Sequence, residues 1–348
     1  MESKYVLGSK INIQLMNFSL IICTYNRRNA IETLMNSIVT QSLYPNQIVI
    51  VDGSLNQDTK TYFEVTNFKN VDYFLVDATH RGLTKQRNFG ISKVNPTSEI
   101  ICFLDDDTIL DENYFSEIVN TYKKFPDAFG VGGCITNEVQ WKENAVDYKE
   151  NDCCFTFDGF HRIEDKRFIL RKMLGLDSDV LPGFSPLFSH GRSVSYLPFS
   201  GKTYKVEQLM GGVSSFRKDV LDTHKFSTYF DGYGLYEDAE FTIRISKLGQ
   251  LYYNTNAKLE HHHDASGRPN QYHYGKMVVR NGWYVWRTKN PNPKMIHCVK
   301  WHTITILLTF IRIANILTTK KRKEAFTESL GRTVGWFSIV FNKPKIIN

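Results

Sequence analysis

Three consecutive aspartates, Asp105, Asp106 and Asp107, directly follow the apolar run at residues 100–104. A short continuous apolar run is typical of a buried strand in a parallel sheet. Three carboxylates would repel one another in a dry core, but where a strand ends they can hold a divalent cation. Mg²⁺ is usually bound by one or two carboxylates together with substrate phosphates. A solvated acidic turn before the next helix is the alternative that these residue types leave open.

Two further apolar runs, at residues 18–23 and 47–51, also end in polar side chains. These are Thr24, Tyr25, Asn26 and Arg27 after the first run, and Asp52 after the second. The carboxyl ends of parallel strands meet at one edge of an open α/β sheet, which is where ligands bind. Backbone N–H groups and carboxylates at that edge suit a nucleotide. Taken singly, Thr24, Asn26 and Asp52 are equally well explained as helix caps and turn formers.

Charged residues at the starts of two later helices are the next candidates. Lys85 and Arg87 lie near the start of a predicted helix, where cations oppose the helix dipole unless an anion is bound there; a solvated basic face is the alternative. Glu237 and Asp238 lie at another helix start, where carboxylates are favourable in any case. Their functional interpretation is a general base that takes a proton from an attacking hydroxyl.

A histidine triplet, His261, His262 and His263, follows a short β-like run. Alone it fits a metal site, a catalytic group or a surface loop. Beside a carboxylate cluster, one of these imidazoles becomes a reasonable further ligand for a cation.

The elements that must position these residues alternate along the chain. We expect strands at residues 18–23, 47–51, 71–76 and 100–104, and helices at residues 31–41, 84–94 and 114–122. This alternation predicts βαβ units and a mostly parallel sheet. Residues 134–205 mix Gly, Pro, Ser and aromatic residues without a sustained period, which is typical of lids or binding loops. No G-x-G-x-x-G or Walker-type motif follows the first strand, which argues against a dinucleotide fold and a P-loop NTPase.

The positive charge is concentrated at the C-terminal end. The net charge is +7, and residues 289–348 hold eleven Lys or Arg against two Glu, a net of +9 that leaves −2 for the rest. Residues 301–311 form an apolar run, and residues 320–323 are all basic. Eleven uncharged residues are fewer than the roughly twenty that span a bilayer. An apolar helix beside a basic cluster suits an anionic membrane surface, and a helix packed on the catalytic domain is the alternative.

The six cysteines show no metal-type spacing, and Cys23 and Cys102 lie in apolar runs. They indicate reduced thiols in a cytoplasmic protein. The first residues contain no apolar signal-peptide core.

Seven short segments, in this order, make the chain resemble the inverting family-2 glycosyltransferases: residues 19–27, 48–54, 82–91, 101–108, 211–221, 236–245 and 257–266. The resemblance implies a GT-A fold, a Rossmann-like α/β architecture with a mostly parallel central sheet. It divides the chain into a lead-in (1–17), a catalytic domain (18–268) and a helical, basic extension (269–348). The nucleotide-sugar half of the catalytic domain would run to about residue 135, and the acceptor half would cover residues 136–268.

The resemblance also implies a role for each candidate residue. Thr24, Tyr25, Asn26 and Arg27 would lie along the nucleotide, Asp52 would contact the base, and Lys85 and Arg87 would meet ribose or phosphates. Asp105 would help to hold the nucleoside sugar, with Asp106 close by. Asp107 would ligate Mg²⁺ or Mn²⁺ on the diphosphate, with His261 as a further ligand and His263 as the second choice. Asp238 would be the catalytic base, with Glu237 beside it.

The expected function is metal-dependent, inverting transfer of a sugar from a nucleotide-diphosphate sugar, usually UDP-linked in this family. The acceptor would be a saccharide or lipid-linked saccharide in surface polysaccharide or glycoconjugate synthesis. We expect a cytoplasmic location, with peripheral contact to the inner face of the cell membrane through residues 295–325, and no nucleic-acid partner. Two departures stand out: the second strand ends in Val-Asp-Gly-Ser where two acidic residues are frequent, and no Gln-x-x-Arg-Trp motif of processive synthases is present.

Two other functions remain open. A nucleotidyltransferase uses a related sheet and a carboxylate-held metal, but residues 24–27 lack the Gly-rich basic loop it needs. A non-enzymatic membrane or nucleic-acid binder would use the basic tail and would leave the carboxylates unexplained.

Overall fold

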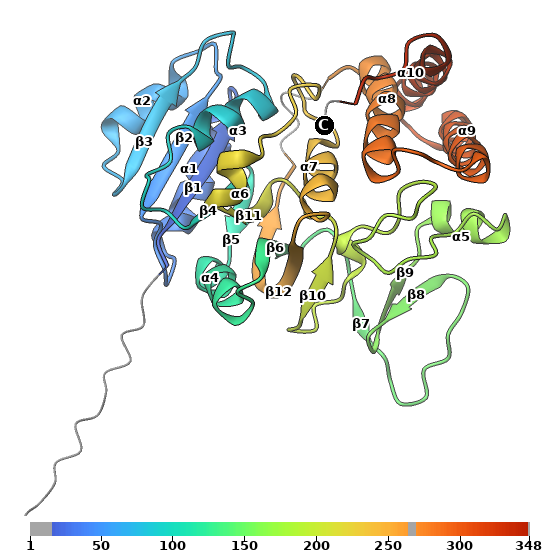
Figure 1. The fold of residues 1–348 in the computed structure, drawn as a ribbon, viewed down its shortest axis with the longest axis horizontal. Helices are drawn as coiled ribbons and strands as arrows, with labels where there is room; N and C mark the ends of the chain where they lie inside the picture. The colour runs from blue at the N-terminus through green and yellow to red at the C-terminus, as the bar shows by residue number, and fades with distance from the viewer. Residues whose placement is uncertain (1–15, 264–268, 347–348) are drawn as a thin grey trace, which may run out of the picture.

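A nine-stranded sheet forms the centre of the computed structural model, which describes residues 16–263 and 269–346 (Figure 1). Its strands are β1 (Phe18–Thr24), β2 (Gln47–Asp52), β3 (Val71–Leu75), β4 (Ile100–Asp105), β5 (Thr108–Leu110), β6 (Ala128–Ile135), β10 (Thr203–Val206), β11 (Val213–Arg217) and β12 (Gln250–His261). Their order is β10-β12-β6-β11-β4-β1-β2-β3, with β5 paired to β12.

Six of these strands run in one direction. β3, β2, β1 and β4 are parallel neighbours. β11 is antiparallel to both β4 and β6, and β6 is parallel to β12, so β6 and β12 point the same way as the first four. The predicted α/β class with a mostly parallel sheet is therefore confirmed. The polar residues that follow β1 and β4 consequently emerge at the same edge.

Helices cover both faces because alternate residues of each strand point to opposite sides. On one face, Leu20 and Ile22 pack in the same cluster as the buried residues of α1 (Arg28–Val39) and α4 (Tyr114–Lys124). On the other face, Ile21 packs with residues of α3 (Leu83–Ile91), α6 (Lys218–Thr223) and α7 (Glu237–Ile245). α2 (Asp58–Val65) lies between β2 and β3 in the chain. The predicted strands and helices all form, with ends that shift by up to three residues.

The segment without a sustained period contains more regular structure than its sequence indicates. It forms β7 (Lys142–Glu143), β8 (Cys154–Phe157) and β9 (Phe160–Ile163), a separate three-stranded sheet in the order β7-β9-β8, followed by α5 (Lys166–Met173) and the short 3₁₀ helix η1 (Val194–Tyr196). Buried Arg192 ties the segment together, with nitrogen–oxygen distances of 2.7 Å to Glu164 and 3.0 Å to Asp177. Such short elements leave too few residues for a hydrophobic period to show.

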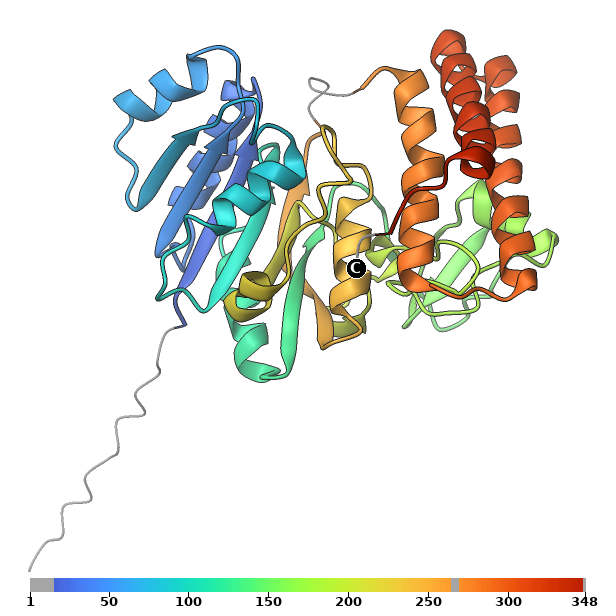
Figure 2. The same cartoon turned by 45° about the horizontal axis from the view of Figure 1, so that its top comes forward.

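Three helices complete the chain and stand together beside the sheet in both views (Figures 1 and 2). They are α8 (Gln271–Lys289), α9 (Met295–Thr318) and α10 (Arg322–Phe341), which confirms the predicted C-terminal helical region. Trp283 and Trp286 of α8 pack against Trp301 of α9, with the rings of Trp283 and Trp301 centred 4.9 Å apart. The helices are thus held by a common aromatic core.

α9 corrects the expectation of a short apolar run. The helix is 24 residues long because it continues through Lys300 and Arg312, and Arg312 is neutralised by Glu328 of α10 at 2.7 Å. By length and composition alone α9 is able to cross a membrane. Most of the predicted lead-in (1–17), and the predicted domain boundary at residue 268, lie outside the described residues.

Candidate functional site

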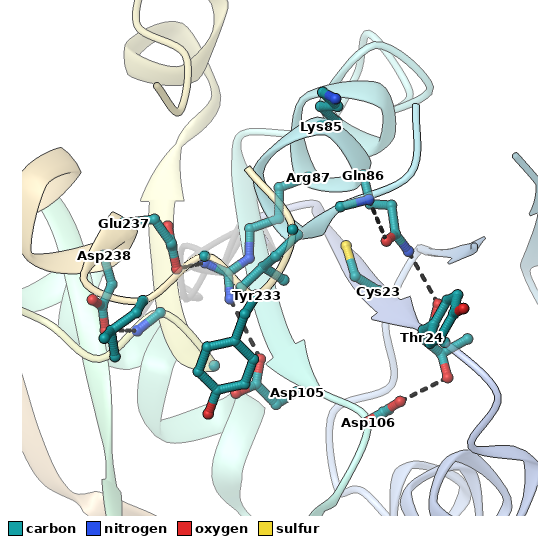
Figure 3. Close-up of a pocket in the computed structure, with 18 of the residues that line it drawn as sticks. Cys23, Thr24, Lys85, Gln86, Arg87, Asp105, Asp106, Tyr233, Glu237 and Asp238 are labelled. Carbon is teal, nitrogen blue, oxygen red and sulfur yellow. Dashed lines mark hydrogen bonds and ion pairs between the residues drawn. The ribbon is translucent and has the colours of Figure 1, made fainter. Parts of the chain in front are cut away.

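A cavity of about 740 Å³ opens where β1 and β4 end. Its wall is built from the turns after these two strands, the start of α3, residues 211–212, the loop 231–236, the start of α7 and the end of β12. Figure 3 shows Glu237 and Asp238 on one side of Arg87, and Thr24 and Asp106 on the other. Segments distant in the sequence thus converge on one pocket of a size suited to a ligand.

The three aspartates after β4 have different surroundings. Asp106 is 2% exposed, accepts a hydrogen bond from the Thr24 hydroxyl at 2.7 Å and pairs with Arg27 at 3.0 Å. Burial raises the pKa of Asp106 to about 7, although Arg27 and Thr24 oppose the rise. Asp105, by contrast, is 36% exposed. Asp106 therefore braces the turn after β1, and Asp105 faces the cavity.

Asp107 and His261 meet because β5 pairs with β12. In that ladder His261 lies opposite Thr108, so the imidazole reaches the residue before it. The His261 Nε2 atom is 3.0 Å from Asp107 Oδ1, and Nδ1 is 3.1 Å from Glu138. Burial lowers the pKa of His261, but the two carboxylates outweigh it and raise that pKa to about 10.

These groups form a donor set for a cation. Ligand atoms of Asp105, Asp107 and His261 lie within 4.8 Å of one another, and those of Glu138, His261 and His263 form a second such group. Carboxylate oxygens and imidazole nitrogen are ligands that Mg²⁺ or Mn²⁺ accepts. The carboxylates of Asp107 and Glu138 on either side of the His261 ring indicate that the site favours a positive charge. The residues present therefore fit a divalent cation.

A buried ion-pair network connects this donor set to the start of α7. Arg87, 2% exposed, pairs with Glu237 and lies 3.4 Å from Asp105. Burial lowers the pKa of Arg87, and Glu237 and Asp105 outweigh that effect, so the guanidinium stays charged. Burial raises the pKa of Glu237, opposed by Arg87. Arg87 thus holds two carboxylates, one from each side of the cavity.

Asp238 lies in the first turn of α7. It accepts hydrogen bonds from the backbone N–H of Gly211 at 3.0 Å and of Ala239 at 2.8 Å. Burial raises the pKa of Asp238, and these two bonds oppose the rise. Tyr236, two residues before Asp238 and directly before α7, has a φ of 69°, a left-handed conformation that costs a non-glycine residue about 1–3 kcal/mol. Strain of this kind is concentrated at ligand-binding sites.

Comparison with known proteins gives a family match for part of the chain. Residues 19–185 match the model of glycosyl transferase family 2. This match, over just under half of the chain, supports a family-2 glycosyltransferase.

Three curated proteins resemble parts of this chain. A glucosyl-dolichyl phosphate glucuronosyltransferase from Haloferax volcanii is 27% identical over 123 residues, covering 34% of this chain and 38% of that protein. An O-antigen chain rhamnosyltransferase from Salmonella typhimurium is 27% identical over 95 residues, covering 27% and 29% respectively. A poly-beta-1,6-N-acetyl-D-glucosamine synthase from Staphylococcus epidermidis is 26% identical over 122 residues, covering 34% and 29%. The matches span less than two fifths of each relative.

Two solved structures are also similar. GalNAc-T7 with UDP, GalNAc and Mn²⁺ aligns with a TM-score of 0.49 at 15% identity, covering 77% of this chain and 48% of that one. TarS of S. aureus aligns with a TM-score of 0.45 at 14% identity, covering 84% of this chain and 43% of that one.

Most of the candidate residues line the cavity. Those that do are Thr24, Tyr25, Arg27, Lys85, Arg87, Asp105, Asp106, Asp107, Glu237, Asp238, His261 and the second choice of ligand, His263. Asn26 and Asp52 do not. Asp52 is fully buried and accepts hydrogen bonds from the Ser54 N–H at 2.7 Å and the Tyr73 hydroxyl at 2.7 Å. Both residues shape the turns after β1 and β2, as their alternative interpretation expected.

Sequence reasoning missed several residues of the candidate site. Glu138 contacts His261 and His263, yet no motif or spacing marks it. Asp231 pairs with Lys85 at 3.1 Å, and Tyr233 lines the cavity. The sequence Asp-Gly-Tyr-Gly at residues 231–234 was a usable signal, because two glycines so close to a carboxylate pair are typical of a binding loop.

Proposed function

We propose that this protein catalyses inverting transfer of a sugar from a nucleotide-diphosphate sugar, UDP-linked by family preference, to an acceptor hydroxyl. One observation carries the proposal. A single cavity holds a cation-type donor set on one side and a partly desolvated carboxylate, Asp238, at the start of α7. A diphosphate leaving group needs a cation to stabilise its charge, and an attacking hydroxyl needs a carboxylate to take its proton.

Asp105, Asp107 and His261 would hold Mg²⁺ or Mn²⁺. When bound, the cation supplies positive charge that stabilises the departing diphosphate, and this effect is largest in the transition state. Arg27 lies 3.5 Å from Asp107, and it would neutralise the excess of carboxylates around the nucleotide. Thr24, Tyr25 and Lys85 line the same cavity and would contact the nucleotide.

Asp238 would take the proton from the acceptor hydroxyl through a carboxylate oxygen. Its raised pKa makes it a stronger base than a solvated aspartate. The Gly211 and Ala239 N–H groups fix the orientation of the carboxylate. Glu237 is engaged by Arg87 and would act through position rather than as a proton acceptor. Direct attack by the hydroxyl inverts the anomeric carbon without a covalent intermediate.

We propose a saccharide or lipid-linked saccharide as acceptor, in surface polysaccharide or glycoconjugate synthesis. The three curated relatives are named for a glucosyl-dolichyl phosphate, an O-antigen chain and a poly-N-acetyl-D-glucosamine, which supports this class of acceptor. We also propose that the protein works at the inner face of a membrane, in contact with anionic lipid through its C-terminal helices.

The test is thermal unfolding with a panel of nucleoside diphosphates, with and without Mn²⁺. A ligand that binds only the folded state at 100 times its Kd adds about 2.7 kcal/mol of stability. We expect a Mn²⁺-dependent rise in melting temperature with a uridine nucleotide, lost in Asp107→Ala and kept in Glu112→Ala, an exposed carboxylate outside the cavity. If folded protein shows no shift with any nucleotide, the proposal is wrong.

A further inference from the structure

α9 carries an exposed apolar stripe along its whole length. Ile296, Val299, Ile306, Phe310, Ile313 and Leu317 are all at least 36% exposed, and Leu317 reaches 82%. They lie three, four or seven residues apart, which is the spacing of one helix face. A soluble surface helix normally turns such a face toward the core. Here it is turned toward solvent.

α10 carries a second stripe of the same kind. Phe326, Leu330, Val334 and Phe337 follow one another at intervals of four, four and three residues, and all are exposed. The opposite side of α10 is buried, with Gly331 and Gly335 against the backbone of α8. The exposed stripe is therefore not a by-product of an unpacked helix.

Both stripes lie on the same side of the helix pair. α9 and α10 run antiparallel, because Trp336 donates to His302 at 3.0 Å whereas Glu328 pairs with Arg312. At roughly 100° per residue, the α9 stripe is turned by about 100° and the α10 stripe by about 155° from the contact between the helices, in the same rotational sense seen from each helix's own N-terminus. In an antiparallel pair, equal senses place both stripes on the same side of the plane through the two helix axes. Figure 2 shows the two helices side by side.

The remaining side of α9 is fixed to the protein. Ile304 is buried with Leu176 and Phe188 of the segment before β10, and Trp301 is buried in the tryptophan cluster. A helix that crossed a bilayer would have to leave both contacts. The described residues place nothing over the two stripes, so the face is available to a partner that lies flat against it.

Charge identifies that partner. Residues 320–323, all basic, span the end of the connection between α9 and α10 and the start of α10, at one end of the face. Lys294, at the start of α9, and Lys343 and Lys345, after α10, lie at the other end because the helices are antiparallel. A second copy of this chain would bring like charge against like charge. Anionic lipid offers the opposite charge together with an apolar interior.

We propose that the common apolar face of α9 and α10 docks on an anionic lipid bilayer, with both helices in the plane of the interface. This deepens the membrane contact in the proposed function by giving its surface, its orientation and its lipid charge. Catalysis at the cavity does not depend on it.

The test is flotation of the full chain with phosphatidylcholine vesicles that contain or lack phosphatidylglycerol. We expect at least tenfold tighter binding to the anionic vesicles, weakened by salt. The double variant Phe310→Glu and Phe337→Glu should lose at least tenfold of this binding, because it places charge in the apolar face. Val65→Glu, at a 77% exposed position on α2, is the matched control and should bind as the wild type does.

Charge is tested separately by changing residues 320–323 to glutamine. Each basic residue near an anionic surface contributes roughly fivefold to binding, so this variant should lose most of its preference for anionic vesicles. Equal flotation of wild type and both variants would overturn the proposal. So would resistance of wild type to carbonate extraction, which indicates a spanning helix, or a concentration-dependent dimer that the Glu variants abolish.

The Mn²⁺-dependent nucleotide shift is measured on the same variants. If the shift is normal while vesicle binding is absent in wild type, the docking proposal fails and the proposed activity stands. If vesicle binding follows the expected pattern but no nucleotide shifts the melting temperature, the proposed activity fails and the docking proposal stands.

Discussion

Gly212→Ala should weaken cation binding without unfolding the protein. A Cβ atom at Gly212 would lie 2.1 Å from Asp105 Oδ2 and 2.2 Å from its Cγ, whereas ordinary contacts begin near 3.4 Å. Asp105 would therefore have to withdraw by roughly 1.3 Å, the difference between these distances. Its side chain is 36% exposed, so it can rotate away and give up its 3.4 Å contact with Arg87.

Displacing one proposed ligand by this distance should reduce metal affinity about 10–100-fold, as loss of a supporting contact does at other metal sites. That range is about 1.4–2.7 kcal/mol. The assay is the Mn²⁺ concentration that gives half-maximal sugar transfer, together with the Mn²⁺ dependence of the nucleotide-induced thermal shift. Gly282→Ala on α8 is the matched control, because its nearest neighbour would be Tyr236 at 3.9 Å.

A double-mutant cycle tests the cause. If Gly212→Ala acts by moving Asp105, it should have no further effect on metal affinity in an Asp105→Ala background. Two results would refute the reasoning: a wild-type Mn²⁺ requirement in Gly212→Ala, or an undiminished effect of Gly212→Ala when Asp105 is already alanine.

Three further predictions follow from the same contacts. Asp238→Asn should lower kcat about 10²–10⁴-fold with little change in nucleotide affinity. The control is Asp219→Asn, which should keep full activity; Asp219 Oδ1 accepts from the Val220 N–H at 2.8 Å, much as Asp238 accepts from the Ala239 N–H. A fully active Asp238→Asn variant would contradict the proposed base. Since a carboxylate base works above its pKa and burial raises the pKa of Asp238, kcat/KM should fall as pH decreases through a value above the ordinary 3.8, and a profile flat down to pH 4 would count against this. Arg192→Met leaves Glu164 buried without its cation, so it should destabilise the protein by about 3–5 kcal/mol in thermal unfolding; a change under 1 kcal/mol would show that the pair is not structural.

The first half of the sheet was predictable because its information is local. β1, β2, β3 and β4 each appear in the sequence as an apolar run, and the helices between them carry a helical period. Convergence of the residues after β1 and β4 then follows from the geometry of parallel strands. The geometry of parallel strands does not determine which way each side chain points at that edge of the sheet. Asp105 and Asp106 are adjacent, yet one faces the cavity and the other is buried against Thr24.

The contacts that organise the site were not predictable, because they join distant residues. Arg87 meets Glu237 across 150 positions of sequence, and His261 meets Glu138 across 123. The position of Arg87 near a helix start indicated that an anion lies beside it. Sequence reasoning assigned that anion to the substrate. In the structure the guanidinium is already occupied by two carboxylates of the chain. Local propensity cannot distinguish these two partners, because either one satisfies the charge.

The spacing of apolar residues likewise predicts that a helix has an apolar face, but it does not predict what that face contacts. The apolar residues of α9 recur at helical spacing whether they face a core, a lipid or a partner. The burial of Ile304 against Leu176 and Phe188, and of Trp301 in the tryptophan cluster, shows which side of α9 packs on the protein. The stripe through Phe310 is not part of that side and is exposed. The distinction between a spanning, a packed and an interfacial helix therefore depends on tertiary contacts.

Arg87 connects the two chemical tasks in the proposed mechanism. One of its nitrogens meets Glu237, next to the proposed base, and another lies 3.4 Å from Asp105 in the cation donor set. Since the guanidinium is planar and buried, a shift of Glu237 or of Asp105 would change one of its two contacts. Binding of a charged donor next to Asp105 and Asp107 would change the charge that Arg87 balances. Arg87 thus contacts both the proposed cation-binding side of the cavity and the residue beside the proposed base.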